Sequence, residues 1–149
     1  MPRLRRIMHA TDFSPASTAA FKRAVAMAKA ARAQLIVAHV VAPPSLALPG
    51  EGYVPPRLYE ELVASTRAQE QKRLDAIVAR ARKAGVRATG LLLEGVAHER
   101  LARAVRARKA DLLVIGTHGR TGLAKLFLGS VATRLVATAP CPVLTVRAR

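Results

Sequence analysis

Apolar residues in this chain follow two patterns that alternate along its length. Short, nearly continuous apolar runs are separated by longer segments in which apolar residues recur every three or four positions. The first pattern is typical of strands covered on both faces, and the second is typical of amphipathic helices. The continuous runs predict five strands, at Leu4–Ala10, Gln34–Val41, Val86–Leu93, Asp111–Ile115 and Val143–Val146.

Four helices are predicted between these strands. They span about Pro15–Ala33, Arg57–Ala84 and Val96–Lys109, and Ser130 caps the fourth. Ser14 is a suitable N-cap, Pro15 fits the first helical position, and Gly85 fits the position after a helix end. The residues expected to face the core are Phe21, Val25 and Ala28, then Leu58, Leu62, Leu74, Ile77 and Ala81, then Leu101 and Val105, and finally Val131, Leu135 and Val136.

The regular alternation of strands and helices predicts one α/β domain over residues 1–149. Such a domain has a doubly wound, open parallel sheet of five strands, joined by right-handed crossovers. The Pro- and Gly-rich segment 42–56 predicts a loop. Ligands of open parallel sheets bind beyond the carboxyl ends of the strands, where the strand order reverses. A ligand-binding site is therefore expected at the carboxyl edge of the sheet.

Three segments are expected to meet at the carboxyl edge: Ala10-Thr11-Asp12, Val40-Val41-Ala42, and the loop after the fourth strand. This loop contains Gly116 and Gly119 and ends at Gly129-Ser130, where a helix begins. A glycine-rich loop that joins a strand to a helix N-terminus predicts a phosphate site, because glycine allows close approach and the first helical N–H groups are unpaired. Neither a P-loop nor G-x-G-x-x-G is present.

Each candidate side chain also has a simpler structural interpretation. The glycines could only form turns, Asp12 could only stabilise the turn before the first helix, and Ser130 could act both as a cap and as a phosphate ligand. His118 has no adjacent carboxylate or nucleophile that would support general acid catalysis. Arg120 and Lys125 could neutralise phosphate charge or could simply be solvated. His39, within an apolar strand, is interpreted as a satisfied core histidine. Cys141 is interpreted as a small core residue and not as a redox site.

The charge composition narrows the class of partner. A formal net charge of +16, from 25 basic and nine acidic residues, would ordinarily indicate nucleic acid or an anionic membrane. The arginines are, however, spread over every predicted helix, and aromatic residues make up only 3% of the chain. We therefore favour a solvated, arginine-rich surface over a nucleic-acid role. No apolar run reaches the roughly 20 residues of a membrane span, the first residues do not match a signal peptide, and the single cysteine fits a reducing cytoplasm.

The glycine spacing gives a more specific indication. Gly116 and Gly119 are followed after nine residues by Gly129-Ser130, which is the pattern G-x2-G-x9-G-S. Together with A-T-D-F-S at 10–14, I-G-T-H-G-R-T-G at 115–122 and A-P-C-P-V-L-T-V-R at 139–147, this pattern resembles the universal stress protein family. ATP-binding members of the family carry G-x2-G-x9-G-[S/T] at this place. The resemblance covers the whole chain.

The resemblance implies a Rossmann-like fold of the adenine nucleotide α hydrolase type, with strand order 3-2-1-4-5. It implies that Ala10 and Asp12 line the nucleoside site, although similar proteins often have proline at the place of Ala10, and that Val40 contacts adenine. Gly116 and Thr117 would contact the ribose, and Gly119, Gly129, Ser130 and Val131 the phosphates. Thr11, Val41, His118 and Arg120 complete the expected nucleotide-binding set. Similar proteins dimerise through the last strand, so a homodimer through Val143–Val146 is expected.

The function implied is an ATP-binding stress-response module of the cytoplasm, regulated by the nucleotide and capable at most of slow hydrolysis. No catalytic residue is assigned, because neither a P-loop lysine nor an acidic pair for two-metal chemistry is evident. Mg²⁺ is expected with the phosphates, with no assigned ligand beyond Asp12. One alternative is an interaction module with a vestigial nucleotide site and a basic surface for acidic partners. Another is an adenylating or electron-transferring enzyme, which would need a further substrate domain.

Overall fold

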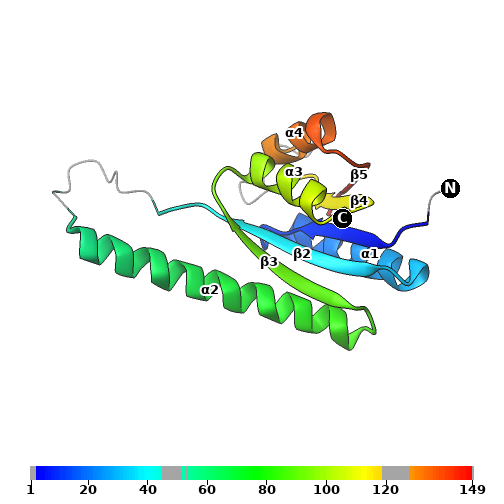
Figure 1. Ribbon diagram of the computed structural model, residues 1–149, viewed down its shortest axis with the longest axis horizontal. Coiled ribbons are helices and arrows are strands. Elements are labelled where there is room, and N and C mark those ends of the chain that lie inside the picture. Colours follow the sequence, from blue (N-terminus) through cyan, green and yellow to red (C-terminus); the bar gives the residue numbers. More distant parts are fainter. Residues whose placement is uncertain (1–2, 45–51, 53, 119–127, 149) are drawn as a thin grey trace.

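The computed structural model describes residues 3–44, 52, 54–118 and 128–148 (Figure 1). Strands and helices alternate as the sequence predicts. Their bounds are β1 (Arg6–Ala10), α1 (Pro15–Ala31), β2 (Gln34–Val41), α2 (Pro56–Lys83), β3 (Ala88–Glu94), α3 (Ala97–Ala107), β4 (Leu112–Gly116), α4 (Ser130–Thr138) and β5 (Val143–Val146). The five strands form a parallel sheet in the order β3-β2-β1-β4-β5, which confirms the predicted fold class and strand order.

The sheet is covered on both faces (Figure 1). Alternate side chains of the strands point to opposite faces and join two separate apolar clusters. Ile7, Leu35 and Val114 pack with α1 and α2 in one cluster, whereas Met8 and Leu113 pack with α3 and α4 in the other. The central strands are therefore buried on both sides, which explains their continuous apolar sequence.

The ends of α1 and α3 differ from the prediction. Ser14 caps α1 as expected, because its hydroxyl accepts a hydrogen bond from the N–H of Ser17 (3.2 Å) and Pro15 is the first helical residue. The helix ends at Ala31, two residues earlier than predicted, because Arg32 adopts a left-handed conformation with φ +53°. Lys109, at φ +51°, similarly follows the end of α3 at Ala107. Neither residue type signals such a conformation in the sequence.

Helix α2 is longer than the part of the sheet that it covers. Its 28 residues extend for about 42 Å, whereas the eight residues of β2 extend for about 26 Å. Leu74 and Ala81 in the second half are buried as predicted, but Leu58 and Leu62 in the first half are 55% and 49% exposed, so their predicted core position is wrong. The first half of α2 extends beyond the sheet (Figure 1).

The remaining core predictions hold in part. Phe21, Ala28, Leu101, Val105 and Leu135 are buried, whereas Val131 and Val136 are 38% and 54% exposed and do not belong to the core. Helix α4 has only nine residues and rests on the sheet through Ala132 and Leu135. A surface helix buries only the residues on one face, so Val131 and Val136, on other faces of α4, stay exposed.

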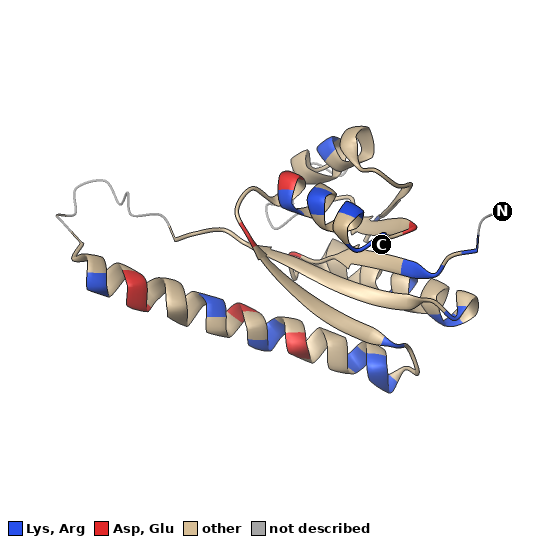
Figure 2. Ribbon diagram, in the orientation of Figure 1, with Lys and Arg blue, Asp and Glu red and all other residues tan. Residues whose placement is uncertain are grey.

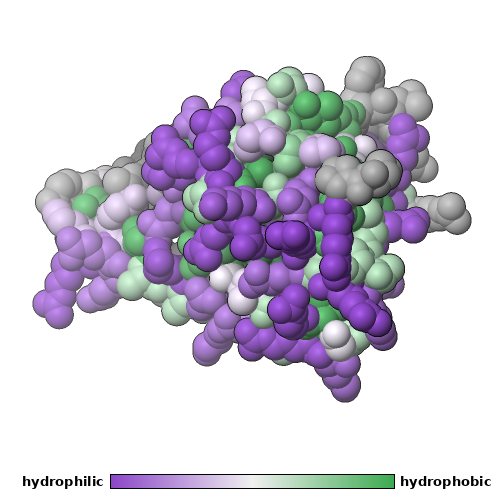
Figure 3. All heavy atoms as spheres, turned by 45° about the vertical axis from the view of Figure 1, so that its right-hand side comes forward, coloured by the Kyte–Doolittle hydropathy of each residue, from purple (hydrophilic) through white to green (hydrophobic). Residues whose placement is uncertain are grey.

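Basic residues are distributed over all the helices, as the sequence suggests. Lys and Arg occur on all four described helices (Figure 2). In the view of Figure 3, hydrophilic side chains cover most of the face, with smaller apolar areas between them. None of the helices in the described ranges is both long and apolar enough to cross a membrane. Cys141 is half-buried beside the core cluster under α3 and α4, and burial raises the pKa of its thiol.

His9 is an ionisable residue at the centre of the sheet. Its side chain is fully buried, Nδ1 donates a hydrogen bond to the carbonyl of Val114 (3.0 Å), and the ring lies 5.8 Å from that of Phe21. Burial lowers the pKa of His9 from 6.5 to about 4, because the apolar surroundings disfavour the imidazolium. The folded protein therefore holds His9 neutral at pH values where the unfolded chain has already bound a proton.

Acidification is expected to destabilise the fold through His9. The stability that the neutral imidazole contributes is present above pH 6.5 and is lost as the pH falls to about 4. A pKa difference of this size corresponds to about 3 kcal/mol of unfolding free energy. Urea unfolding at pH 7 and pH 4.5 should show the decrease, and His9→Leu should remove most of its pH dependence. An unchanged pH dependence in this variant would assign the effect to other groups.

Candidate functional site

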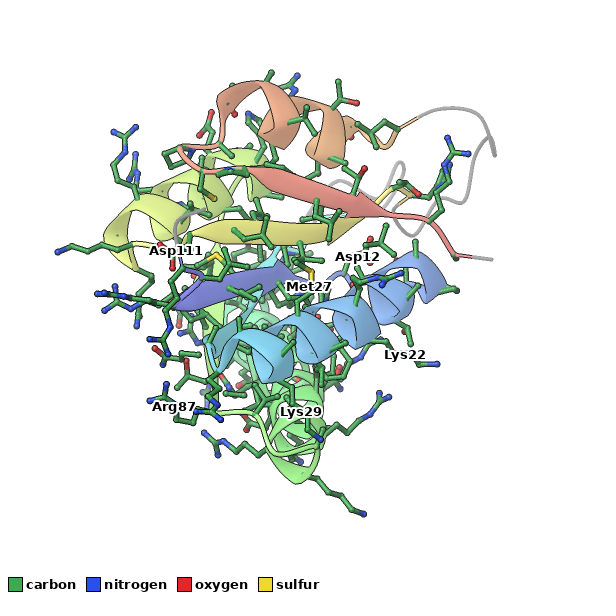
Figure 4. The ribbon with its side chains drawn as sticks, turned by 90° about the vertical axis from the view of Figure 1, so that its right-hand side faces the viewer. Asp12, Lys22, Met27, Lys29, Arg87 and Asp111 are labelled. Atoms are coloured by element: carbon green, nitrogen blue, oxygen red, sulfur yellow. The ribbon has the colours of Figure 1, made fainter. Side chains whose placement is uncertain are left out.

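The loop between β1 and α1 is held by a set of short hydrogen bonds. Oδ1 of Asp12 accepts from the N–H of Ser14 (2.9 Å), and Oγ1 of Thr11 accepts from the N–H of Phe13 (3.1 Å) and from the Ser17 hydroxyl (2.8 Å). Phe13 itself has a positive φ of +63°. Asp12 therefore has the structural role in the turn that the sequence allowed, and it also lies at the carboxyl end of β1. Asp12 and Asp111 mark opposite edges of the sheet (Figure 4).

The end of β2 contributes a buried histidine to the same region. Nδ1 of His39 lies 2.7 Å from the carbonyl oxygen of Thr11 and must donate its proton there, because a carbonyl can only accept. Nε2 of His39 then faces Oε2 of Glu70 on α2 at 2.5 Å. The imidazole is only 4% exposed and each ring nitrogen has a polar partner, so it is a satisfied core histidine as predicted. It also connects α2 to the β1–α1 loop.

Two ring contacts strengthen this connection. The ring of Phe13 packs on the imidazole of His39 with centroids 4.4 Å apart, and the guanidinium of Arg73 lies 4.1 Å above the same phenyl ring. Arg73 also lies 3.4 Å from Oε1 of Glu70. The second half of α2 thus supports the Asp12 turn from behind.

The end of β4 and the start of α4 form the opposite side of the site. The N–H of Gly129 donates to the carbonyl of Thr117 (2.6 Å), so the chain returns to β4 as α4 begins. Gly129 is the N-cap and makes no side-chain cap bond, and Ser130 is the first helical residue. The prediction that Ser130 caps α4 is therefore wrong by one position. Because Gly129 has no side chain to accept from them, the first N–H groups of α4 form a candidate anion site.

These segments enclose a cavity of about 190 Å³ at the carboxyl edge. Ten of the thirteen predicted nucleotide-binding residues line its wall: Ala10, Thr11, Asp12, Val40, Gly116, Thr117, His118, Gly129, Ser130 and Val131. Val41 does not line the cavity, because its side chain is buried on the other face of the sheet from that of Val40. Gly119 and Arg120 lie outside the described residues, as does Lys125.

Seven further residues that line the cavity were not predicted from the sequence. Those from segments already considered are Ser17, Ala38, His39, Ile115 and Ala132. Ala97 and Leu101 come from the first two turns of α3, which no polar motif marks. A signal for α3 was nevertheless present: β3 is parallel to the other strands, so the helix that follows it must also begin at the carboxyl edge.

Gly116 has a packing role besides its place in the cavity. A Cβ atom at this position would lie 2.8 Å from the carbonyl carbon of Ala16 and 3.0 Å from its oxygen. Real Cβ atoms do not approach a backbone so closely, and a backbone cannot turn aside as a flexible side chain can. Glycine is therefore required here so that the end of β4 can pass against the start of α1.

The cavity combines two kinds of surface. Small apolar residues of β1, β2 and α3 form one part, which suits a flat ring, and the N-terminus of α4 forms the other, which suits an anion. Asp12 is the one carboxylate among the described residues that line it. Within the described ranges, no three acidic, histidine or cysteine side chains gather as a metal site would require. The arrangement is therefore that of a binding site for an anionic ligand with a planar ring.

Comparison with known proteins agrees with this arrangement. The sequence profile of the universal stress protein family matches residues 3–147. A universal stress protein of Methanocaldococcus jannaschii is 35% identical over 96% of this chain and 82% of its own length. The crystal structure of a universal stress protein family member from Burkholderia pseudomallei is 32% identical, covers 98% of both chains and superposes with a TM-score of 0.75.

Several relatives of known structure hold adenine nucleotides. A universal stress protein in complex with cAMP is 25% identical, covers 99% of this chain and 100% of its own, and has a TM-score of 0.69. An Arabidopsis thaliana family protein has AMP bound; it is 20% identical, covers 97% of this chain and 92% of its own, has a TM-score of 0.69, and shares the fold. From the fold, the cavity and these matches, we conclude that this chain belongs to the universal stress protein family.

Proposed function

We propose that this chain binds ATP in the cavity at the carboxyl edge and acts as a nucleotide-dependent stress-response module of the cytoplasm. The observation that carries the proposal is the position of the cavity, where small residues of β1 and β2 face the uncapped N-terminus of α4. The pattern G-x2-G-x9-G-S is complete in the sequence, and a relative with 25% identity holds an adenine nucleotide.

In the proposed complex, adenine lies beside Val40 and the backbone of Ala10 and Thr11. The ribose lies near Gly116 and Thr117, and the phosphates face Gly129, Ser130 and Val131. The positive end of the α4 dipole and its first N–H groups would stabilise the phosphate charge. Gly119 and Arg120 belong to the loop between these residues and are proposed as further phosphate contacts.

Mg²⁺ is proposed to enter with ATP, held mainly by phosphate oxygens, as is usual for this ion. Asp12 can supply a carboxylate oxygen to it, although Oδ1 already accepts from Ser14. The ion would neutralise phosphate charge in the cavity. His118, whose Nδ1 lies 2.9 Å from Oγ1 of Thr117, is oriented by its neighbour. We assign it a contact role and propose that hydrolysis is slow at most.

Nucleotide analysis tests the proposal directly. The purified protein is heated, and the released supernatant is analysed for ATP, ADP and AMP; thermal unfolding is then measured with ATP–Mg²⁺, AMP and cAMP. ATP in the supernatant and the largest rise in melting temperature with ATP–Mg²⁺ are expected. Stabilisation by AMP or cAMP alone would overturn the assignment to ATP. No bound nucleotide and no thermal shift would favour the interaction module.

We also propose that the chain forms a homodimer through β5. This strand is at the edge of the sheet, and all four of its residues are half-buried. The carbonyl of Pro142 accepts from Leu113 of β4, and that of Val146 accepts from Thr117 directly after β4. The backbone of Val143 and Thr145 therefore faces outward by alternation. Exposed strand edges of this kind pair readily with a second chain.

Replacing Thr145 with proline is expected to convert the dimer to a monomer. Proline removes one outward N–H, and folded proteins tolerate it on edge strands. Thr145→Val retains the N–H and should remain dimeric. Light scattering after size-exclusion chromatography distinguishes the two states. If Thr145→Pro still gives the mass of a dimer, another surface forms the interface.

A further inference from the structure

The amino edge of the sheet, opposite the nucleotide cavity, has two adjacent hollows lined by basic side chains. The first, of about 390 Å³, is lined by Arg3, Arg5, Arg6, Arg32 and Arg87, with Leu4 and Gln34. The second, of about 330 Å³, shares Arg6 and Gln34 and adds Arg108 and Lys109. The two hollows, which we call the basic edge, thus present seven cationic side chains. Arg87 and Asp111 lie toward this edge and Asp12 toward the other (Figure 4).

Acidic residues do not balance this charge. Eight acidic residues lie in the described ranges, and seven of them are on α2 or at the carboxyl edge: Asp12, Glu60, Glu61, Glu70, Asp75, Glu94 and Glu99. The eighth, Asp111, is at the amino edge, where its Oδ2 accepts the backbone N–H groups of Arg5 (2.7 Å) and Arg6 (2.8 Å), and its single negative charge offsets only one of the seven cations. The view in Figure 2 shows the same asymmetry, with Lys and Arg predominating where β1, β2 and β3 begin.

Helix dipoles explain only part of this charge distribution. Cations near helix C-termini are generally favourable, and Arg32, Arg108 and Lys109 follow the ends of α1 and α3. Arg3, Arg5 and Arg87 precede strands, however, and Arg6 begins one. Like charges gathered along one edge repel each other, and an anion bound between them would offset this repulsion. Nη2 of Arg87 donates to the carbonyl of Arg32 at the end of α1 (3.5 Å), so three arginines, Arg3, Arg5 and Arg6, have no helix end to account for them.

We propose that the basic edge binds linear inorganic polyphosphate. Guanidinium groups bind phosphate oxygens with two parallel hydrogen bonds, and six of the seven cations are arginines. No aromatic ring is among the described residues that line the hollows, so these residues provide no aromatic platform for nucleic-acid bases. A chain of phosphates without bases or sugars fits two adjoining hollows of this composition. Because this edge is opposite the cavity, ATP and polyphosphate would not compete.

The test must separate a specific site from the attraction of a strongly basic protein. One variant, Arg6→Gln, Arg87→Gln and Arg108→Gln, removes cations from both hollows. The matched control, Lys22→Gln, Arg23→Gln and Lys72→Gln, removes the same charge from exposed positions on α1 and α2. Binding of fluorescently labelled, long-chain polyphosphate is measured by anisotropy at several salt concentrations. Single-stranded DNA of equal charge is the competitor, and ATP affinity and the melting temperature are measured for every protein.

The first variant is expected to bind polyphosphate about tenfold more weakly or worse, and the slope of log affinity against log salt should fall by about 2. The control should lose less than about threefold, and ATP affinity should be unchanged in both. Equal losses in the two variants would show non-specific attraction and overturn the proposal. DNA that displaces polyphosphate at equal or lower concentration would also overturn it, in favour of a nucleic-acid surface. The result for ATP is independent of either outcome.

Discussion

Replacing Gly129 with valine is expected to abolish ATP binding while the chain remains folded. Gly129 lines the cavity and is the N-cap of α4, where the phosphates are proposed to lie. Its backbone angles, φ −58° and ψ 156°, are open to any residue, so valine introduces no backbone strain. The added isopropyl group would occupy space next to the first N–H groups of the helix. A loss of about a hundredfold or more in affinity, equivalent to about 3 kcal/mol, is expected.

Isothermal titration calorimetry with ATP–Mg²⁺ measures this effect, and Gly52→Val is the matched control. A Cβ at Gly52 meets nothing within 4 Å, and the residue does not line the cavity. The control should bind ATP as the unchanged protein does. Gly129→Val should melt within a few degrees of the unchanged protein, because a less favourable N-cap residue typically costs about 1 kcal/mol. Gly52→Val should melt as the unchanged protein does, because its added Cβ meets no other atom. Unchanged ATP affinity in Gly129→Val would place the phosphates elsewhere.

Replacing Gly116 with alanine is expected to destabilise the fold itself. The new methyl group would lie 2.8 Å from the backbone of Ala16, so β4 and α1 would have to move apart. Overpacking of this kind typically costs about 1–3 kcal/mol, and the rigid neighbour favours the upper end of the range. For a domain of this size, the melting temperature should fall by about 5–10 °C. Differential scanning calorimetry without nucleotide isolates this effect from any change in ATP binding.

Gly90 supplies the comparison for this result. It also lies in a strand, but a Cβ there would meet the side chains of Leu74 and Val78 at 3.3 Å, and these can shift by a few tenths of an ångström. Gly90→Ala should therefore change the melting temperature little. If both alanine variants melt alike, the close approach of Gly116 to Ala16 is not what requires glycine at that position.

The sequence predicted the fold because apolar runs and helical periods alternate regularly. The bounds of β2 and β5 are those predicted, since polar or proline residues delimit both runs. β1 begins at Arg6 and not at Leu4. The N–H groups of Arg5 and Arg6 bond instead to the side chain of Asp111, more than one hundred residues away. Contacts so distant in the chain leave no trace in a local pattern.

The candidate site was predictable to the extent that it follows strand ends. Ala10 to Asp12 and Gly116 to His118 line the cavity because the ends of adjacent parallel strands must meet. Val41 was included although the alternation of side chains places it opposite Val40. The pairing of His39 with Glu70 could not be foreseen, because nothing in the sequence sets the register of α2 against β2. For the same reason, the sequence could not show that Leu58 and Leu62 lie on the part of α2 that extends beyond the sheet.

His39 belongs at once to the wall of the cavity and to the attachment of a helix. One nitrogen of its ring bonds to the carbonyl of Thr11, and the other faces Glu70 on α2. If the proposed nucleotide shifts the Thr11 carbonyl, it would also change the contact that His39 makes with Glu70 on α2. Coupling free energies are reciprocal. If ligand binding favoured one position of α2, a partner that held α2 in that position would favour ligand binding by the same free energy. In the proposed complex, one side chain would then couple the occupancy of the cavity to the position of α2.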